Sequence, residues 1–211
     1  MKRAGYGSIF IYLVLLPIAA SGGIRFKPGR APEVRTFFIS EIGYMHRLDS
    51  DPREIYGQSI HHYFESHFGL MRNVSAKYAV GMTNFFSLDN DGELRWGLNG
   101  RVRRWLGKSN SVDISAGAIF YDSDSAFKSP QFRSDLCFNI RDLLILSVGY
   151  GIASYTVGEW RYQEVPEYIV YSGTDHAVYT GIRVGSKPGL IGNILAAIAG
   201  VIFWAAFAGG D

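Results

Sequence analysis

Polar and apolar residues alternate strictly along the middle of the chain. From Val74 to Ile152, the even-numbered positions are mostly apolar, whereas the odd-numbered positions carry charges, small polar residues and most of the glycines. A period of two places successive side chains on opposite faces of an extended strand, so the pattern predicts strands with one apolar and one polar face. The clearest alternating segments are 74–83, 94–103, 111–120, 132–140 and 144–152.

The length of these segments distinguishes a soluble β-sandwich from a β-barrel that spans a membrane. A strand in a soluble sandwich is usually about five or six residues long. A tilted strand that crosses a bilayer needs about nine to eleven. The segments here run to nine or ten residues, and their even-numbered faces carry no charge at central positions. Charges mixed with glycine on the other face suit a narrow lumen, because an eight-stranded barrel has just enough interior for side chains.

We therefore predict an all-β fold: an eight-stranded antiparallel transmembrane β-barrel with a C-terminal apolar helix. The expected strands are 36–48, 58–70, 74–88, 93–106, 111–121, 131–140, 143–155 and 174–184. Their connections are short at 71–73, 107–110 and 141–142 and long at 49–57, 122–130 and 156–173, with 89–92 as a tight exception. Short turns on one rim and long loops on the other are typical of outer-membrane barrels. An even strand count leaves both ends of the barrel in the periplasm.

The N-terminal residues 1–21 have the features of a signal peptide. Lys2 and Arg3 precede the apolar run Ile9–Ala20, and small residues follow at the expected cleavage site. A retained anchor is the alternative, but twelve apolar residues with an internal proline are too short for ~30 Å of hydrocarbon. The predicted organisation is a signal peptide (1–21), a periplasmic segment (22–34), the barrel (35–185) and the helix (186–211).

The C-terminal segment Leu190–Ala208 contains no charge. A helix of this length rises ~28 Å, just enough to cross a bilayer. A buried helix and a helix lying at the interface are the alternatives. Gly192, Ala196 and Gly200 are spaced four apart, and small residues at this spacing allow close helix packing.

Charge and cysteine content exclude several classes of function. The chain of 211 residues has a formal charge of +2, and without Lys2 and Arg3 its 19 basic residues match its 19 acidic ones. No basic face is expected, so no nucleic-acid partner is expected either. The single cysteine excludes a disulfide framework and any CxxC motif, and we expect no cofactor.

The expected inward face holds both signs of charge. Unpaired buried charges are costly, so we expect these side chains to pair across strands and plug the lumen. The predicted lumen charge network consists of Glu41, Glu65, His67, Arg95, Arg101, Arg103, Asp113, Arg133, Asp135, Asp175 and Arg183.

The dense cluster from His61 to His67 is the strongest candidate for chemistry. His67 and Glu65 share the inward face, and a His–Glu pair near a serine could support acyl hydrolysis. Ser66, however, has the opposite parity, so we predict no catalytic residues. His61 and His67 lie ~20 Å apart along one strand and cannot share a zinc ion, so we predict no metal site.

The expected loop 156–173 combines aromatic and charged side chains. Such a loop is a plausible recognition surface for a surface protein partner, or an aromatic rim at the membrane interface. The candidate residues are Trp160, Arg161, Tyr162, Tyr168 and Tyr171.

Residues 34–185 resemble the small eight-stranded outer-membrane barrels of the OmpA/OmpX/OmpW type, by pattern and strand count rather than by a sequence motif. The resemblance implies the bacterial outer membrane, with membrane lipid and lipopolysaccharide as surroundings. Those families usually end on the last strand with an aromatic residue, whereas this chain continues into a helix.

The sequence thus favours a non-enzymatic barrel with an envelope-structural or surface-recognition role through its longer loops. A narrow pore or a carrier for a small or apolar solute is one alternative, and an outer-membrane lipid-modifying hydrolase is another. A soluble periplasmic sandwich tethered by the helix is the third.

Overall fold

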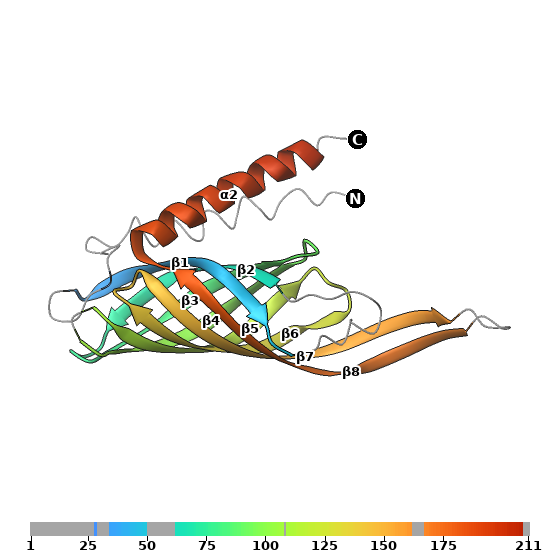
Figure 1. The fold of residues 1–211 in the computed structure, drawn as a ribbon, viewed down its shortest axis with the longest axis horizontal. Helices are drawn as coiled ribbons and strands as arrows, with labels where there is room; N and C mark the ends of the chain where they lie inside the picture. Colours follow the sequence, from blue (N-terminus) through green and yellow to red (C-terminus); the bar gives the residue numbers. More distant parts are fainter. Residues whose placement is uncertain (1–27, 29–33, 50–61, 108, 162–166, 209–211) are drawn as a thin grey trace.

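The computed structural model describes residues 28, 34–49, 62–107, 109–161 and 167–208. Within these residues, eight antiparallel strands form a closed barrel and one helix follows them (Figure 1). The strands are β1 (Thr36–Arg47), β2 (His62–Asn73), β3 (Tyr78–Asp89), β4 (Leu94–Trp105), β5 (Ser111–Asp122), β6 (Phe127–Ile140), β7 (Leu144–Arg161) and β8 (Glu167–Val184), and the helix is α2 (Ser186–Ala208).

The barrel closes between its first and last strands. β1 pairs with β8 from Ile42↔Val184 to Arg47↔Tyr179, and every other strand pairs with its neighbour in the chain. Closure leaves no free edge along the barrel wall. The predicted all-β, eight-stranded antiparallel barrel with a C-terminal helix is confirmed.

Two rims can be distinguished. The terminal rim carries the start of β1, the end of β8 and the turns 74–77, 106–110 and 141–143, and the loop rim is the opposite end of the barrel. Along most of the wall, odd-numbered residues point inward and even-numbered residues point outward. The alternation breaks at the loop-rim end of β5, where Tyr121 is exposed and the side chain of Asp122 is buried.

Several predicted boundaries are wrong. The second strand, described as His62–Asn73, ends at 73 rather than at 70, and the turn after it is 74–77 rather than 71–73. The predicted start of this strand, 58–61, lies outside the described residues. The hydroxyl of Ser75 accepts hydrogen bonds from the backbone N–H groups of Lys77 and Tyr78, which stabilises this turn. The alternating pattern runs through the turn unbroken, so it could not mark the strand end.

The predicted loops 122–130 and 156–173 are also largely strand. β6 already begins at Phe127. β7 and β8 pair continuously up to Arg161↔Glu167, beyond the ends of the other strands. Aromatic and β-branched residues populate both segments and favour extended pairing. They form a two-stranded ribbon, residues 155–161 with 167–173, that projects from the loop rim (Figure 1).

Helix α2 runs back along the outside of β1 (Figure 1). Its Asn193 amide donates to the hydroxyl of Ser40 at 2.8 Å and to the carbonyl of Glu41 at 3.2 Å. Ser66 donates to Oδ1 of Asn193 at 2.7 Å. One helix residue thus satisfies two outward-facing hydroxyls on neighbouring strands.

The small residues of the helix contribute unequally to this contact. A Cβ added at Gly189 would lie 2.3 Å from the carbonyl oxygen of Ser40, so only glycine allows this approach. Gly192 lies against Ile42, whereas Ala196 is exposed and the surroundings of Gly200 lie outside the described residues. Among the helices that the structure describes, none is long and apolar enough to cross a membrane, which differs from the span expected for Leu190–Ala208.

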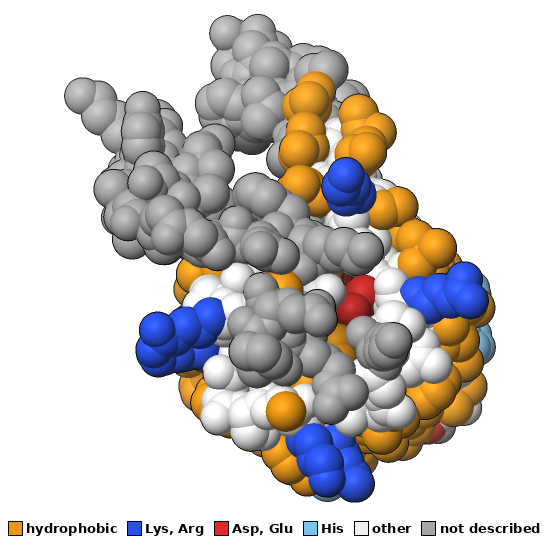
Figure 2. Space-filling model, turned by 90° about the vertical axis from the view of Figure 1, so that its left-hand side faces the viewer, with side chains coloured by type: hydrophobic (Ala, Val, Ile, Leu, Met, Phe, Trp, Pro, Cys, Tyr) orange, Lys and Arg blue, Asp and Glu red, His pale blue; other side chains and the backbone are white. Residues whose placement is uncertain are grey.

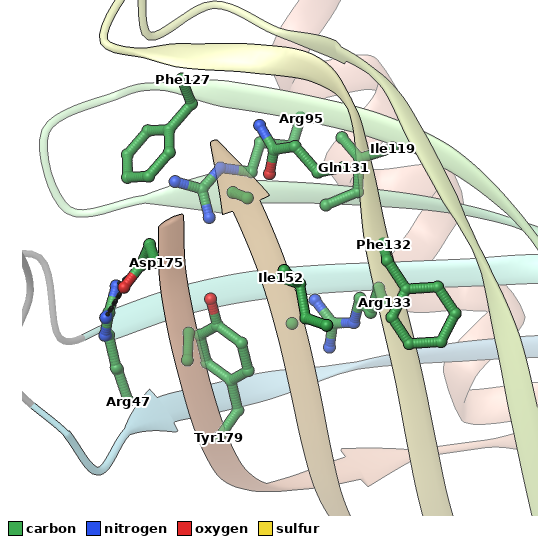
Figure 3. Close-up of a pocket in the computed structure, with 13 residues that line it drawn as sticks. Arg47, Arg95, Ile119, Phe127, Gln131, Phe132, Arg133, Ile152, Asp175 and Tyr179 are labelled. Carbon is green, nitrogen blue, oxygen red and sulfur yellow. Dashed lines mark hydrogen bonds and ion pairs between the residues drawn. The ribbon is translucent and has the colours of Figure 1, made fainter. Parts of the chain in front are cut away.

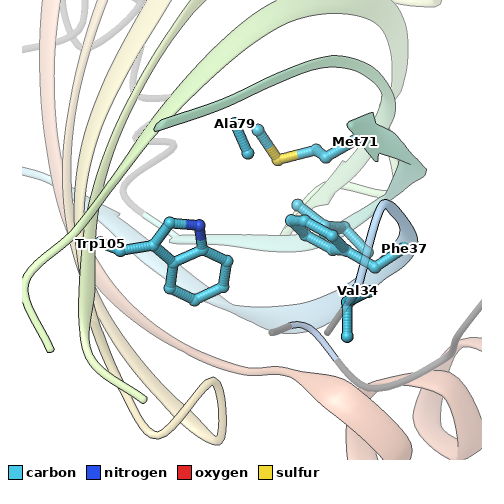
Figure 4. Packing of buried hydrophobic residues seen from close by; sticks show 6 residues of the cluster. Val34, Phe37, Met71, Ala79 and Trp105 are labelled. Atoms are coloured by element: carbon cyan, nitrogen blue, oxygen red, sulfur yellow. The ribbon is translucent and has the colours of Figure 1, made fainter. Parts of the chain in front are cut away.

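Apolar residues fill the two ends of the lumen. At the terminal rim, Trp105 lies at 5.8 Å from Phe37 between ring centroids, and its indole N–H donates to Asn73. This cluster consists of Val34, Phe37, Ile39, Met71, Ala79 and Trp105 (Figure 4). A second cluster, Met45, Tyr63, Ala177 and Tyr179, lies toward the loop rim. Most of the lumenal charged side chains occupy the layer between the two clusters, whereas Arg47 and Asp175 lie on the loop-rim side of the second cluster.

Candidate functional site

All the residues of the predicted charge network are buried inside the barrel. They come from six of the eight strands, all except β3 and β7. The strand alternation brings them to one surface, and the small barrel radius brings opposite walls within reach of an arginine side chain.

One half of the central network is built around Asp113. Its carboxylate lies 2.6 Å from Nη2 of Arg101 and 2.8 Å from Nε of Arg103. Arg101 also reaches Glu41 on the opposite wall at 2.6 Å, and Arg103 reaches Asp142 at 2.6 Å. Asp113 therefore holds two adjacent guanidinium groups that would otherwise repel each other.

The other half is built around Glu65 and Asp135. Arg133 lies 2.6 Å from Glu65 and 3.0 Å from Asp135, and Arg183 lies 3.2 Å from each. A longer contact of 3.8 Å between Arg183 and Glu41 joins this half to the first. Nε2 of His67 lies 3.2 Å from Glu65.

Together the two halves place four guanidinium groups among five carboxylates, and each of these arginines has at least two carboxylate partners. Buried ions are tolerated only when such partners compensate for lost hydration. The ion pairs reach across the lumen and are flanked by apolar clusters on both sides. This arrangement fills the interior and cross-links the walls.

Three partners in the lumen were missed by the sequence analysis. Arg47 lies 2.6 Å from Asp175, and Arg95 lies 3.0 Å from Asp122. Arg47 has an odd number and lies at the end of the first strand, so the alternation could have predicted that its side chain points inward. Asp142 and Asp122 have even numbers and lie at strand ends, where the chain leaves the regular alternation, so parity could not identify them.

Two of the residues considered for catalysis, Glu65 and Ser66, make other contacts in the structure. Glu65 is held by Arg133 and Arg183, and Ser66 faces outward, where it bonds to Asn193. His61 lies outside the described residues. No group of three or more His, Cys, Asp or Glu side chains among the described residues is arranged to hold a metal ion. Cys137 is buried and accepts a 3.5 Å contact from Arg183.

The candidate recognition residues lie on the projecting ribbon. Tyr168 and Tyr171 belong to β8, and Tyr168 is exposed. Trp160 and Arg161 belong to β7, opposite Tyr168 and Glu167 in the strand register. Tyr162 lies outside the described residues.

The outer wall of the barrel is apolar. Its exposed side chains include Met82, Val102, Ile114, Leu136, Val148 and Ile182. In water this belt would be costly, because soluble monomers rarely expose apolar patches larger than a few hundred Å². In a bilayer, the belt is the surface that lipid chains solvate.

Basic side chains surround the terminal rim. Figure 2 looks onto this rim and shows Lys and Arg side chains spaced around it. Six bases there are exposed, namely Arg35, Arg72, Lys77, Arg104, Arg141 and Lys187. In the described part of this rim, the one acidic residue, Asp142, points inward and is buried.

No protein-family model and no curated protein matches this chain. Among solved structures, the chain is similar to a designed protein described as "De novo design of transmembrane beta-barrels". The identity is 14%, the TM-score is 0.37, and the match covers 70% of this chain and 93% of that one. It is also similar to "Solution NMR structure of de novo designed TMB2.3", with 13% identity, a TM-score of 0.35 and coverage of 75% and 94%. The fold assignment here depends on the strand pairing itself.

Proposed function

We propose that the protein is a non-enzymatic β-barrel of the bacterial outer membrane with a closed lumen and an envelope-structural role. The observation that supports this proposal is the buried ion-pair network between two apolar clusters. Such an interior rigidifies the barrel and leaves little room for solute flow. The proposal includes export by the signal peptide 1–21, with membrane lipid and lipopolysaccharide as the surroundings.

The outer surface supports the membrane placement. The apolar belt matches lipid chains, and the exposed bases of the terminal rim match anionic phospholipid head groups. With the terminal rim in the periplasm, these bases meet the phospholipid leaflet of an outer membrane. The ribbon then projects outside the cell.

Electrophoresis of the membrane fraction with and without boiling tests the barrel in the membrane. A closed barrel resists SDS until it is heated, so its mobility should change on boiling. Unchanged mobility, together with release of a soluble fragment by protease near 185–189, would instead support a tethered periplasmic domain.

Conductance in a planar bilayer tests the closed lumen. The wild-type barrel should give no discrete current steps. A double variant, Arg133→Ala with Arg183→Ala, removes two guanidinium groups from the network and should increase leakage if it still folds. Regular current steps from the wild type would contradict the closed lumen and support the pore alternative.

A recognition role is a second candidate, and the projecting ribbon is the observation that favours it. The ribbon carries Tyr168 and Tyr171 beyond the rim, where a surface protein partner could contact them. Deleting 157–171 should keep the heat-dependent mobility of the barrel and abolish crosslinking of cells to that partner. Crosslinking that survives the deletion would exclude the ribbon as the contact site.

A further inference from the structure

Three outward-facing side chains meet at the loop-rim ends of β1 and β2. His46 on β1 lies directly opposite His62 on β2, and this is the last described pair of their ladder at that rim. Tyr44, two residues before His46, packs its ring against His62 with the centroids 5.5 Å apart. Arg47, the next residue along β1, points inward and pairs with Asp175 instead (Figure 3). The alternation of the strand therefore keeps the three side chains together on the outer face.

The two imidazole rings approach each other through one nitrogen each. Their centroids are 5.0 Å apart and their planes are inclined by 30°, whereas the two Nδ1 atoms are only 3.4 Å apart. Two nitrogens that bind the same tetrahedral zinc ion at about 2.0–2.1 Å are about 3.3–3.4 Å from each other. The separation of Nδ1 of His46 from Nδ1 of His62 thus matches the spacing of two ligands of one metal ion.

Tyr44 brings an oxygen to the same point. Its hydroxyl is in hydrogen-bond contact with Nδ1 of His62. Tyr44 is 49% exposed, His62 is exposed and His46 is half-buried, so the cluster is accessible from outside the barrel. The exposed ring of Tyr44 has room to withdraw when an ion replaces the shared proton. Two imidazole nitrogens, the phenol oxygen and one water complete the four-ligand shell that zinc prefers.

This cluster differs from the metal sites considered from the sequence. His61 and His67 belong to one strand and are too far apart to share an ion, whereas His46 and His62 are brought together by strand pairing across 16 residues of chain. The cluster contains two histidines and a phenol, so it is smaller than a group of three His, Cys, Asp or Glu side chains. Imidazole nitrogens favour zinc, copper and nickel over magnesium and calcium, which prefer oxygen ligands.

We propose that His46, His62 and Tyr44 bind one divalent transition-metal ion, such as Zn²⁺, on the outer face of the barrel at the loop rim. The ion joins β1 to β2 at the end of their ladder. Because these ligands are brought together only by folding, the free energy of metal binding stabilises the folded barrel.

Calorimetric titration of the untagged, metal-free barrel with ZnCl₂, in nonionic micelles, measures the binding. One Zn²⁺ per chain should bind. His46→Gln and His62→Gln should each weaken binding by at least about 10-fold, since even the loss of a group behind a metal ligand typically costs about 10–100-fold. Tyr44→Phe should weaken binding less, because both nitrogens remain. MgCl₂ should not bind to the cluster.

The outer face of β7 and β8 provides a matched control. The hydroxyl of Tyr150 lies 2.7 Å from Nδ1 of His176, with the ring planes inclined by 30°. This pair has the same phenol–imidazole contact, but among the described residues it lacks a second histidine. His176→Gln should therefore bind zinc as the wild type does. An equal loss of affinity in His176→Gln would show that binding does not require the histidine pair.

The temperature at which the barrel loses its unheated mobility in SDS gives an independent readout. Zinc should raise this temperature in the wild type and in His176→Gln, and should have no effect on the double variant His46→Gln with His62→Gln. Unchanged zinc affinity in either single histidine variant would exclude the site. A wild-type barrel that binds no zinc but keeps its heat-dependent mobility contradicts this inference alone and leaves the proposed function intact.

Discussion

Substitution of a single residue in the lumen should strongly affect the stability of the barrel, because the central carboxylates Glu41, Glu65, Asp113 and Asp135 each contact two arginines. Asp113 lies within 2.8 Å of both Arg101 and Arg103 and is almost completely buried. Removing one member of a buried ion network leaves an uncompensated charge, which costs more than the pair contributes. Shared carboxylates are therefore the most sensitive positions in the barrel.

We predict that Asp113→Asn destabilises the barrel by about 3–5 kcal/mol, since it leaves two neighbouring guanidinium groups short of a partner. Urea unfolding in micelles, followed by tryptophan fluorescence, measures the change. Asp91→Asn, in the exposed turn after β3, is the matched control and should have little effect. A cost for Asp113→Asn as small as that of the control would contradict the network as a stabilising element.

Asp142 should respond to pH in the opposite sense to a paired surface carboxylate. It lies in the turn before β7, and burial raises its pKa above 3.8, despite the lowering effect of Arg103. The folded state then binds a proton more readily than the unfolded state. The stability contributed by this group is present below about pH 3.8 and falls as pH rises through the folded pKa.

We predict that Asp142→Asn removes this dependence. Asn tolerates the left-handed backbone at this position, where φ is 53°. The difference in free energy of unfolding between wild type and variant should therefore shift in favour of the variant as pH rises through the folded pKa. A difference that does not change between pH 3 and 7 would show that burial does not control this carboxyl group.

At the scale of elements, the docking of α2 on β1 can be tested directly by disulfide crosslinking. A Cβ built at Gly192 would lie 3.7 Å from the Cβ of Ile42. This distance is close to the mean Cβ separation of about 3.8 Å in a disulfide. Asn193 lies next to this contact and bonds to both β1 and β2.

We predict that Ile42→Cys with Gly192→Cys forms a disulfide in the folded barrel, seen as a changed mobility that dithiothreitol reverses. Ile42→Cys with Leu195→Cys is the control, because Leu195 is exposed, and it should crosslink poorly. Adding Asn193→Leu should lower the crosslinking yield, because two hydroxyls on the wall lose their partner. Equal yields for the two cysteine pairs would mean that the helix is not docked as described.

At the scale of the whole molecule, the described residues of the terminal rim have a single sign of exposed charge. Its six exposed bases surround the end of the barrel where both strand termini lie. Each Lys or Arg near an anionic surface contributes about 1 kcal/mol. The molecule therefore has one end where the described residues expose bases and an opposite end that carries the ribbon, and we propose that the basic end contacts anionic head groups.

We predict that the barrel is more stable in vesicles containing phosphatidylglycerol than in pure phosphatidylcholine. Arg72→Gln with Arg104→Gln should reduce this difference, and the reduction should disappear in high salt because surface charges are screened. Unfolding temperatures in the two vesicle types measure the effect. A difference that the two substitutions leave unchanged would exclude the basic rim as its cause.

The sequence by itself determined the strand number, the inward and outward faces and most of the lumenal charges. These follow from a period of two that holds along most of each strand, so that Glu41, Asp113 and Arg183 could be placed by parity alone. Parity is local, because the backbone fixes it from one residue to the next.

Only the tertiary structure decided which charges pair, how far β7 and β8 extend, and where the helix lies. The contact of Arg101 with Glu41 joins walls separated by 60 residues, and no local pattern encodes barrel closure. The helix contact through Asn193 has the same origin. It arises where elements distant in the chain meet, and the geometry of that meeting is set by the closed barrel.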